Sequence, residues 1–474
     1  MLFNSYTFII FFTIIIILHY LPFSWRTKKI NLLLASYLFY AAWNPPFVIL
    51  LWISTIADWF FSKRIYTSTT HAKRKLFVIG SLSVNLGMLA FFKYGNFFLE
   101  NLVQFCNLIN IEYHPPAMDI ILPVGISFYT FQTLSYTMDI YLKRGKPWKS
   151  FLDYALFVTF FPQLVAGPIV RSSDFLPQCI KQNKEALSKI GWGLSLLLLG
   201  LFEKVVLADG IFAPVTEIVF DKVGQPSTGT AIAGTLAFAG QIFCDFAGYS
   251  TCAIGAAMCL GFNLPDNFRF PYAAIGFSDF WKRWHISLSS WLRDYLYIPL
   301  GGNKKGKRRT QINLILTMLL GGLWHGASWT FVIWGGLHGF YLIIEKLCIQ
   351  LFGKASIWKK PIIQLLLASI TFSCICLAWI FFRAGSFDQA VIIILSILGS
   401  PVSTVDLYIS HEQFNTVIIV MSLLLTTHWL MRNKSLELLA KQTPWPVRSC
   451  VLALMFTIIL MMPGEDRAFI YFQF

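Results

Sequence analysis

The chain has 474 residues, of which 56% are hydrophobic, 17% aromatic and only 13% charged. Soluble domains carry about 25% charged residues, so this low charge, spread along the whole length, excludes a string of ordinary soluble domains. Disordered, collagen-like and low-complexity chains are excluded as well, because aromatic residues are abundant and the 31 glycines follow no repeat. The composition predicts an all-α, polytopic integral membrane protein.

The formal net charge of +15 comes from short basic runs that lie between apolar segments. These runs are 26–29, 63–75, 143–149 and 304–309. Short loops rich in Lys and Arg mark the cytoplasmic side of a membrane protein, and we expect 63–75 and 304–309 to share that side. A nucleic-acid partner is not expected, since it would need a basic groove interleaved with aromatic residues.

Apolar segments of membrane-spanning length follow one another along the chain, because a spanning helix needs about 20 apolar residues. They are 6–22, 30–43, 46–62, 76–98, 118–142, 151–170, 188–208, 229–262, 311–332, 333–352, 361–382, 414–431 and 448–462. Several are short or interrupted by proline, which favours re-entrant segments for some of them. We therefore expect about 11 transmembrane helices, plus re-entrant and interfacial helices, in a single membrane domain over 1–474.

One stretch, Ser278–Pro299, has the pattern of an amphipathic helix rather than of a span. Ser278 is a plausible N-cap, Asp279 lies in the first turn, and Pro299 ends the helix. Each residue of an α-helix turns about 100° around the axis, and this spacing puts the apolar residues of the stretch on one stripe of the helix. It contains Trp281, Trp284, Leu288, Trp291, Leu292, Tyr295 and Leu296, with Arg293 and Asp294 elsewhere. A helix this rich in Trp and Arg is typical of a membrane interface. His285 falls on its apolar stripe, which we expect to turn His285 inward.

A second stretch, Leu319–Gly339, is rich in glycine and tryptophan. Gly322 and Gly326 enclose Trp324 and His325, and a second pair of glycines four residues apart encloses His338. This small-residue spacing lets helix backbones approach closely, so each histidine is expected to meet a neighbouring helix. The two histidines are 13 residues apart, or about 220° along one continuous helix, so both face one cavity only if the helix breaks.

Ionisable residues inside membrane segments are the candidates for chemistry. His325 is one, although a core histidine bound to a backbone carbonyl fits the same pattern. Asp245, four residues before Tyr249, is another: it pairs with a cation, holds a histidine tautomer or makes a structural hydrogen bond. No HExxH metal motif and no GxSxG nucleophile motif occurs, so no metal is expected. The residues alone fit an acyl transferase with a histidine base and, equally, a transporter with a proton-relaying histidine.

The motifs of the chain resemble those of bacterial membrane-bound O-acyltransferases (MBOAT). The strings that carry the resemblance are Phe280–Asn303 (FWKRWHISLSSWLRDYLYIPLGGN), Leu320–Ala327 (LGGLWHGA), Pro123–Phe128 (PVGISF), Ala166–Arg171 (AGPIVR) and Phe469–Phe474 (FIYFQF). They look most like the alginate O-acetylase branch, which also includes membrane components of peptidoglycan and cellulose acetylation. Similar proteins often carry an acid after Gly-Tyr-Ser, where this chain has Thr251, so a role for that acid is not transferred.

The resemblance implies a ring of membrane helices around a thin centre, with a signature core at about 120–350. It implies that His325 is catalytic and that His285 is its second polar partner. Asp245, Tyr249, Trp324, Arg293 and Asp294 are then the possible supporting residues. No bound cofactor and no metal is expected, and acetyl-CoA is the expected donor substrate.

The same resemblance implies a cellular localisation and a set of partners. The protein is expected in the cytoplasmic (inner) membrane, as a multi-pass protein surrounded by lipid. Similar systems pass the acetyl group to an extracytoplasmic acetyltransferase of the serine-hydrolase type, which modifies a polysaccharide. Two alternatives stay open: a transporter or flippase of an acylated carrier, and a non-catalytic scaffold of a polysaccharide-modifying complex. The presence of both motif histidines counts against the scaffold.

Overall fold

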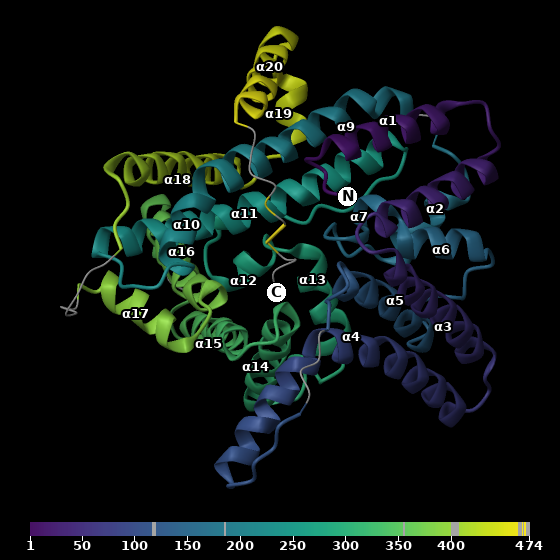
Figure 1. Ribbon diagram of the computed structural model, residues 1–474, viewed down its shortest axis with the longest axis horizontal. Coiled ribbons are helices and arrows are strands. Elements are labelled where there is room, and N and C mark those ends of the chain that lie inside the picture. The colour runs from purple at the N-terminus through teal and green to yellow at the C-terminus, as the bar shows by residue number, and fades with distance from the viewer. Residues whose placement is uncertain are drawn as a thin grey trace. The chain divides into compact units, whose positions relative to one another are not determined.

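The computed structural model describes residues 1–115, 120–183, 186–353, 356–399, 407–462, 467 and 469–470. Within these ranges the chain is helical, apart from turns, loops and an isolated β-bridge between Pro226 and Leu407 (Figure 1). It forms two compact units. The first contains Met1–Leu194 and Ala253–Pro265, and the second contains Ser195–Cys252 and Asp266–Phe474. Two of the three boundaries fall inside helices α9 and α11, and the third falls in the loop after α11.

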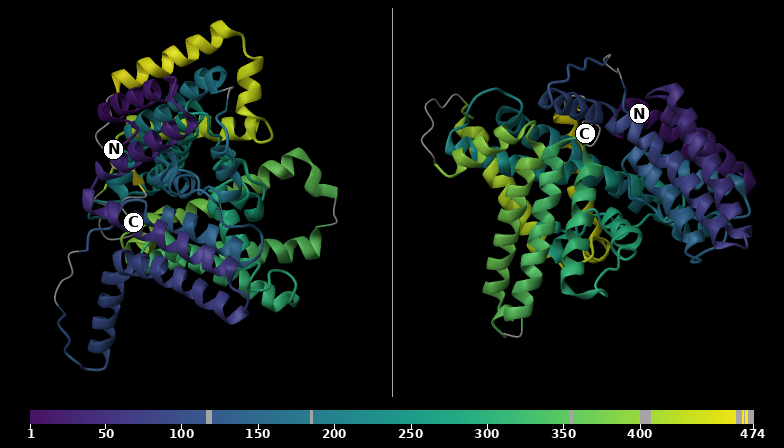
Figure 2. Two further views of the ribbon diagram at one scale, coloured as in Figure 1. Left: turned by 90° about the vertical axis from the view of Figure 1, so that its right-hand side faces the viewer. Right: turned by 90° about the horizontal axis from the view of Figure 1, so that it is seen from below.

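The first unit is built mainly from the N-terminal helices. They are α1 (Tyr6–Tyr20), α2 (Trp25–Ala41), α3 (Val48–Thr67), α4 (His71–Leu108), α5 (Ile126–Tyr141), α6 (Phe151–Thr159), α7 (Phe161–Leu164), α8 (Ser172–Phe175), the start of α9 (Ala186–Leu201) and the 3₁₀ turns η1 (Pro45–Phe47) and η2 (Leu176–Cys179). Helices α3, α4 and α5 pack against one another, and α2 packs on α6. The buried residues of α4 lie between Val78 and Leu89, and the second half of this 38-residue helix extends away from its neighbours (Figure 2).

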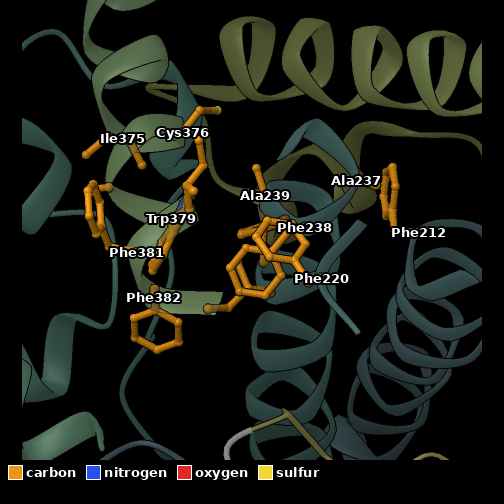
Figure 3. Packing of buried hydrophobic residues seen from close by; sticks show 14 of the residues in the cluster. Phe212, Phe220, Ala237, Phe238, Ala239, Ile375, Cys376, Trp379, Phe381 and Phe382 are labelled. Atoms are coloured by element: carbon orange, nitrogen blue, oxygen red, sulfur yellow. The ribbon is translucent and has the colours of Figure 1, made fainter. Parts of the chain in front are cut away.

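The second unit contains the candidate residues. Its elements are η3 (Phe202–Phe212), α10 (Ala213–Phe220), most of α11 (Thr228–Cys259), η4 (Pro271–Ala273), α12 (Phe277–Trp281), α13 (Ile286–Leu292), η5 (Arg293–Tyr297), α14 (Gly306–His325), α15 (Trp329–Phe352), η6 (Ser356–Lys359), α16 (Pro361–Arg383), α17 (Phe387–Ile397), α18 (His411–Met431), α19 (Leu436–Gln442) and α20 (Trp445–Met461). Helix α14 turns back on α15 and packs along it. Figure 3 shows part of the core, where Phe238 of α11 meets Trp379 and Phe382 of α16.

The prediction of an all-α, multi-pass membrane protein is confirmed. In the part of the chain that the structure describes, six helices are long and apolar enough to cross a membrane. They are Pro45–Thr67, His71–Leu108, Thr228–Cys259, Trp329–Phe352, Pro361–Arg383 and His411–Met431. The count of about 11 is not confirmed, because α1, α17 and α20 are shorter apolar helices. The interpretation of 1–474 as one domain, with its core at about 120–350, stays a prediction.

Large apolar side chains cover the exposed faces of the outer helices. On α1, four isoleucines (Ile9, Ile10, Ile14 and Ile17) are each at least half exposed, and α20 has no buried residue. Soluble proteins rarely expose apolar surface in such continuous patches. These faces are suited to lipid.

The prediction of a single continuous helix over Ser278–Pro299 is wrong. The chain forms α12, breaks at Lys282–His285, and resumes as α13 followed by the π-helical turn η5. The break is at His285, which has φ 43°, in the left-handed region that a helix cannot include. The N-cap is Gly276 rather than Ser278, whereas Asp279 does lie in the first turn, as predicted.

Candidate active site

His325 is the last residue of α14, and its side chain is buried among aromatic rings. The imidazole centroid lies 4.9 Å from Trp324, 5.0 Å from Trp334 of α15 and 5.3 Å from Phe382 of α16. All three contacts are edge-to-face, the arrangement that aromatic pairs prefer. Phe382, the ring that α16 contributes, is labelled in Figure 3. The rings exclude water from His325 on the sides that they cover.

Glycine explains why α14 ends at His325 and lies so close to α15. A Cβ atom on Gly322 would come within 2.3 Å of the Phe331 carbonyl oxygen, and one on Gly335 within 2.3 Å of the Met318 carbonyl oxygen. After His325 the backbone becomes extended at Gly326, and Ser328 caps α15 by accepting the N–H of Thr330. The predicted close approach of helix backbones is confirmed.

His285 is fully buried and takes part in a polar network. Its Nδ1 lies 3.2 Å from Oδ1 of Asn267, which also accepts the backbone N–H (3.3 Å) and the hydroxyl (2.8 Å) of Ser287. These bonds identify Oδ1 as an acceptor, so Nδ1 of His285 carries the proton and Nε2 carries a lone pair. The amide nitrogen of Asn267 donates in turn to Ser250 of α11 (3.2 Å). The buried position of His285 is as predicted, but it results from the break in the helix and not from an apolar stripe.

Backbone hydrogen bonds and an ion-pair cluster hold the turn at His285. Arg269 donates its N–H to the Arg283 carbonyl, and Ile286 donates to the Asn267 carbonyl, each at 2.9 Å. The carboxylate of Asp279 accepts from Arg283 Nε (2.9 Å) and Arg432 (2.7 Å). Burial alone would raise the pKa of Asp279, but the hydrogen bonds from Arg432, the Ile275 N–H and Arg283 outweigh it and lower the pKa below its usual value.

Tryptophan rings connect three histidines in one row, which we call the histidine–tryptophan row: His285, Trp324, His325, Trp334 and His338. Successive ring centroids are 6.1, 4.9, 5.0 and 4.6 Å apart. Because the helix breaks after His325, both His325 and His338 contact the same Trp334. His338 also stacks on Phe280 and contacts Trp281 of α12, so each glycine-flanked histidine meets a neighbouring helix, as predicted.

Asp245 pairs with a cation, which is one of the three alternatives that the sequence left open. Its Oδ1 lies 2.5 Å from Lys204 Nζ, and the same ammonium group binds Asp209 at 2.9 Å. The other carboxylate oxygen of Asp245 accepts the backbone N–H of Ile470 at 2.7 Å. Asp245 therefore anchors the segment that contains Phe469 and Ile470.

Tyr249, one turn along α11 from Asp245, is buried against that same segment. Its ring centroid lies 5.0 Å from Phe469. Phe246, which lies between Asp245 and Tyr249, contacts both Phe469 (5.6 Å) and His285 (4.7 Å). These rings connect the C-terminal segment to the candidate site.

The other two supporting residues lie in a different environment. Arg293 and Asp294 form an ion pair of 2.8 Å at the π-helical turn, and the Arg293 side chain is 62% exposed. Thr251, at the position where similar proteins often have an acid, donates its hydroxyl to the Ala247 carbonyl within α11. A role of Arg293 or Asp294 in the chemistry stays a prediction.

Asn267 and Phe382 were not predicted from the sequence, and Lys204, expected to pair with the neighbouring Glu203, was not predicted as the partner of Asp245. Asn267 lies in an irregular loop 18 residues before His285, where no periodic pattern exists. Lys204 lies 41 residues before Asp245, and Phe382 is one apolar residue among many in α16. The only available signal was that Lys204 is a basic residue inside an apolar segment, which is a reason to look for a buried partner.

The sequence profile described as MBOAT, membrane-bound O-acyltransferase family, matches residues 144–383, a span that includes every candidate residue from Asp245 to His325. The chain belongs to this family. A peptidoglycan O-acetyltransferase of Helicobacter pylori is 36% identical, covering 94% of this chain and 91% of its own length. A probable alginate O-acetylase of Azotobacter vinelandii is 39% identical, covering 82% of this chain and 76% of its own. The predicted resemblance is confirmed, and this MBOAT protein is an acyltransferase.

A more distant relative is named for a different acyl group. A teichoic acid D-alanyltransferase of Streptococcus thermophilus is 28% identical, covering 52% of this chain and 63% of its own length. The relatives of this chain are thus named for two different acyl groups. The roles of His325 and His285 in this chain stay predictions.

Proposed function

We propose that this MBOAT protein takes an acetyl group from a cytoplasmic thioester, acetyl-CoA, and transfers it to a hydroxyl group, for O-acetylation of an extracytoplasmic polysaccharide. The observation that carries the proposal is His325, buried at the end of α14 among Trp324, Trp334 and Phe382. Relatives named for peptidoglycan and alginate O-acetylation support both the acetyl group and the polysaccharide.

In this proposal His325 is the general base. Its neutral imidazole takes the proton of the acceptor hydroxyl while that oxygen attacks the thioester carbonyl carbon. The C–S bond then breaks, and the proton passes to the leaving thiolate. Such proton transfer contributes about 10²- to 10⁴-fold to a rate. The aromatic neighbours favour this role, because they keep bulk water away from the imidazole.

His285 is proposed as the residue that orients the reacting groups. A second polar residue beside the base has two possible roles, orientation and stabilisation of the oxyanion. Because Asn267 accepts from Nδ1, the other ring nitrogen of His285 carries a lone pair and accepts a hydrogen bond. An oxyanion needs a donor, so this tautomer supports orientation.

The basic run 304–309 supports a cytoplasmic donor. Lys304, Lys305 and Lys307 are exposed at the start of α14, where they are suited to attract the phosphates of coenzyme A. From Arg309 to His325 is 16 residues, or about 24 Å along a helix, within a hydrocarbon core of about 30 Å. A donor entering beside this run reaches His325 from the cytoplasmic side. We place the protein in the cytoplasmic membrane, with an extracytoplasmic acetyltransferase of the serine-hydrolase type as partner.

The experiment is transfer of labelled acetyl from acetyl-CoA by the purified full-length protein in detergent, where no gradient exists. Turnover, as hydrolysis or transfer to a hydroxyl acceptor, is expected. A strict requirement for sealed vesicles would favour the transporter alternative, and absence of turnover under both conditions would favour the scaffold. A D-alanyl thioester, supplied in parallel, tests the choice of acyl group and should turn over more slowly than acetyl-CoA.

A further inference from the structure

The first compact unit contains a buried acid that the acyl-transfer proposal does not use. Asp58 lies on α3 and is fully buried where α3, α4 and α5 pack together. Both of its oxygens accept hydrogen bonds from α4: Oδ1 from the hydroxyl of Ser81, and Oδ2 from the amide nitrogen of Asn85 at 3.0 Å. The carboxyl group is therefore held in a defined position by a neighbouring helix.

Further polar groups surround this centre from every packed helix. The carbonyl oxygen of the Asn85 side chain accepts from Ser54 of α3 (2.6 Å) and from Thr133 of α5 (3.3 Å). Thr137 of α5 also faces the Asp58 carboxyl. The titratable groups that interact with Asp58 are Tyr136 of α5 and Tyr154 of α6, both buried phenols. Hydroxyl groups thus form most of the environment of Asp58.

No cation is paired with Asp58. Among the described residues, no Lys, Arg or His lies within ion-pair distance of its carboxyl group, whereas the other buried acid of this unit, Asp153, is paired with Lys29. One buried hydroxyl beside the site, that of Tyr154, also has no hydrogen-bond partner in the part of the chain that the structure describes. Burying an ionised carboxylate without a counter-ion costs several kcal/mol, and acids in that position usually become neutral instead.

We propose that Asp58 binds a proton in the folded protein, so that α3, α4, α5 and α6 together form a proton site in the first unit. One proton from water binds one carboxylate oxygen, and no other bond changes. The neutral carboxyl group then requires no counter-ion, and its O–H has hydroxyl acceptors on α4, α5 and α6. An intramembrane acid in such a polar seam is typical of proton sites in membrane proteins. This proposal does not depend on the acyl-transfer proposal.

Infrared spectroscopy of the full-length protein at pH 7 tests the proposal. The carbonyl stretch of a protonated carboxylic acid is expected in the wild type, shifted by 13C-labelled aspartate. Asp58→Asn, which has nearly the shape of the neutral acid, should lose this band and melt near the wild-type temperature. The matched control, Asp153→Asn, should keep the band and melt at a clearly lower temperature, because it leaves the Lys29 ammonium buried without its counter-ion.

Three outcomes would overturn the proton site. They are absence of the band in the wild type, persistence of the full band in Asp58→Asn, and a sodium-dependent rise in melting temperature that Asp58→Asn abolishes. The last outcome would assign the site to a metal cation instead. If Asp58→Asn fails to fold, Asp58→Glu serves the same purpose: the band should remain but lose its sensitivity to labelled aspartate. A band still sensitive to that label would contradict the assignment to Asp58.

Discussion

His325 and Asp58 are both buried titratable residues, but different side chains pack around them. The imidazole of His325 packs against the rings of Trp324, Trp334 and Phe382, whereas the carboxyl group of Asp58 accepts hydrogen bonds from a hydroxyl and an amide group. Rings exclude water from the imidazole, which the proposed function assigns as the general base. Hydroxyl and amide groups satisfy the hydrogen-bonding capacity of a buried carboxyl group and hold it in place. Under the two proposals, the second unit holds a side chain that reacts, whereas the first holds one that only binds a proton.

After substitution of His325 itself, substitution of His285 is expected to cause the largest loss of acetyl transfer. Asn tolerates the left-handed backbone, and its amide nitrogen can replace Nδ1 as the donor to Asn267, but it lacks the second ring nitrogen. We expect His285→Asn to remain folded and to lose about 10²-fold in acetyl transfer, the lower end of the range for acid–base residues. The measurement is kcat for acetyl transfer, with the melting temperature as a check on folding.

His338→Asn is the matched comparison for His285→Asn. Both histidines are fully buried and lie in the histidine–tryptophan row, but His338 is separated from His325 by Trp334. The His338 variant should retain more acetyl transfer than the His285 variant by about tenfold or more. Equal losses of acetyl transfer in both variants would indicate that the histidine–tryptophan row is only structural. The contrast between a reactive His325 and an unreactive Asp58 would then fail.

A smaller effect, on the stability of the fold, is expected from glycine substitutions where α14 and α15 touch. Gly322→Ala places a methyl group against the Phe331 carbonyl, at 2.3 Å, and overpacking of this kind costs about 1–3 kcal/mol. Gly336→Ala on α15 meets Leu319 at 3.6 Å, an ordinary contact, and should cost much less. Thermal unfolding of both variants measures the difference. If Gly336→Ala were the more destabilising of the two, the close approach would not be what holds His325.

The sequence predicted the parts of this molecule that depend on composition and local spacing. The apolar segments predicted a helical membrane protein, and the glycine spacing around His325 and His338 predicted the close contact of α14 with α15. The burial of His285 was predicted for the wrong reason. Helical periodicity assumes a continuous helix, and only the pairing of 267–269 with 283–286, distant in sequence, creates the break that buries it.

Partners that come from distant segments were not predictable from one sequence. Asn267 binds His285 because an irregular loop returns to the turn, and Lys204 binds Asp245 across two helices. Neither pairing leaves a periodic signal. The number of spanning helices is not confirmed for a related reason: an apolar run such as 448–462 satisfies the composition of a span, but α20 has only 17 residues. Length and burial are properties of the fold and not of the composition.

The most direct measurement is acetyl transfer by His325→Ala, purified and shown to be folded and inserted in the membrane. The control is His428→Asn, because buried His428 accepts the Tyr272 N–H at 3.3 Å through Nδ1, a bond that an Asn oxygen can replace. We expect the His325 variant to lose at least about 10²-fold while the control keeps most of its activity. More than about a tenth of wild-type activity in His325→Ala would contradict its role as the general base.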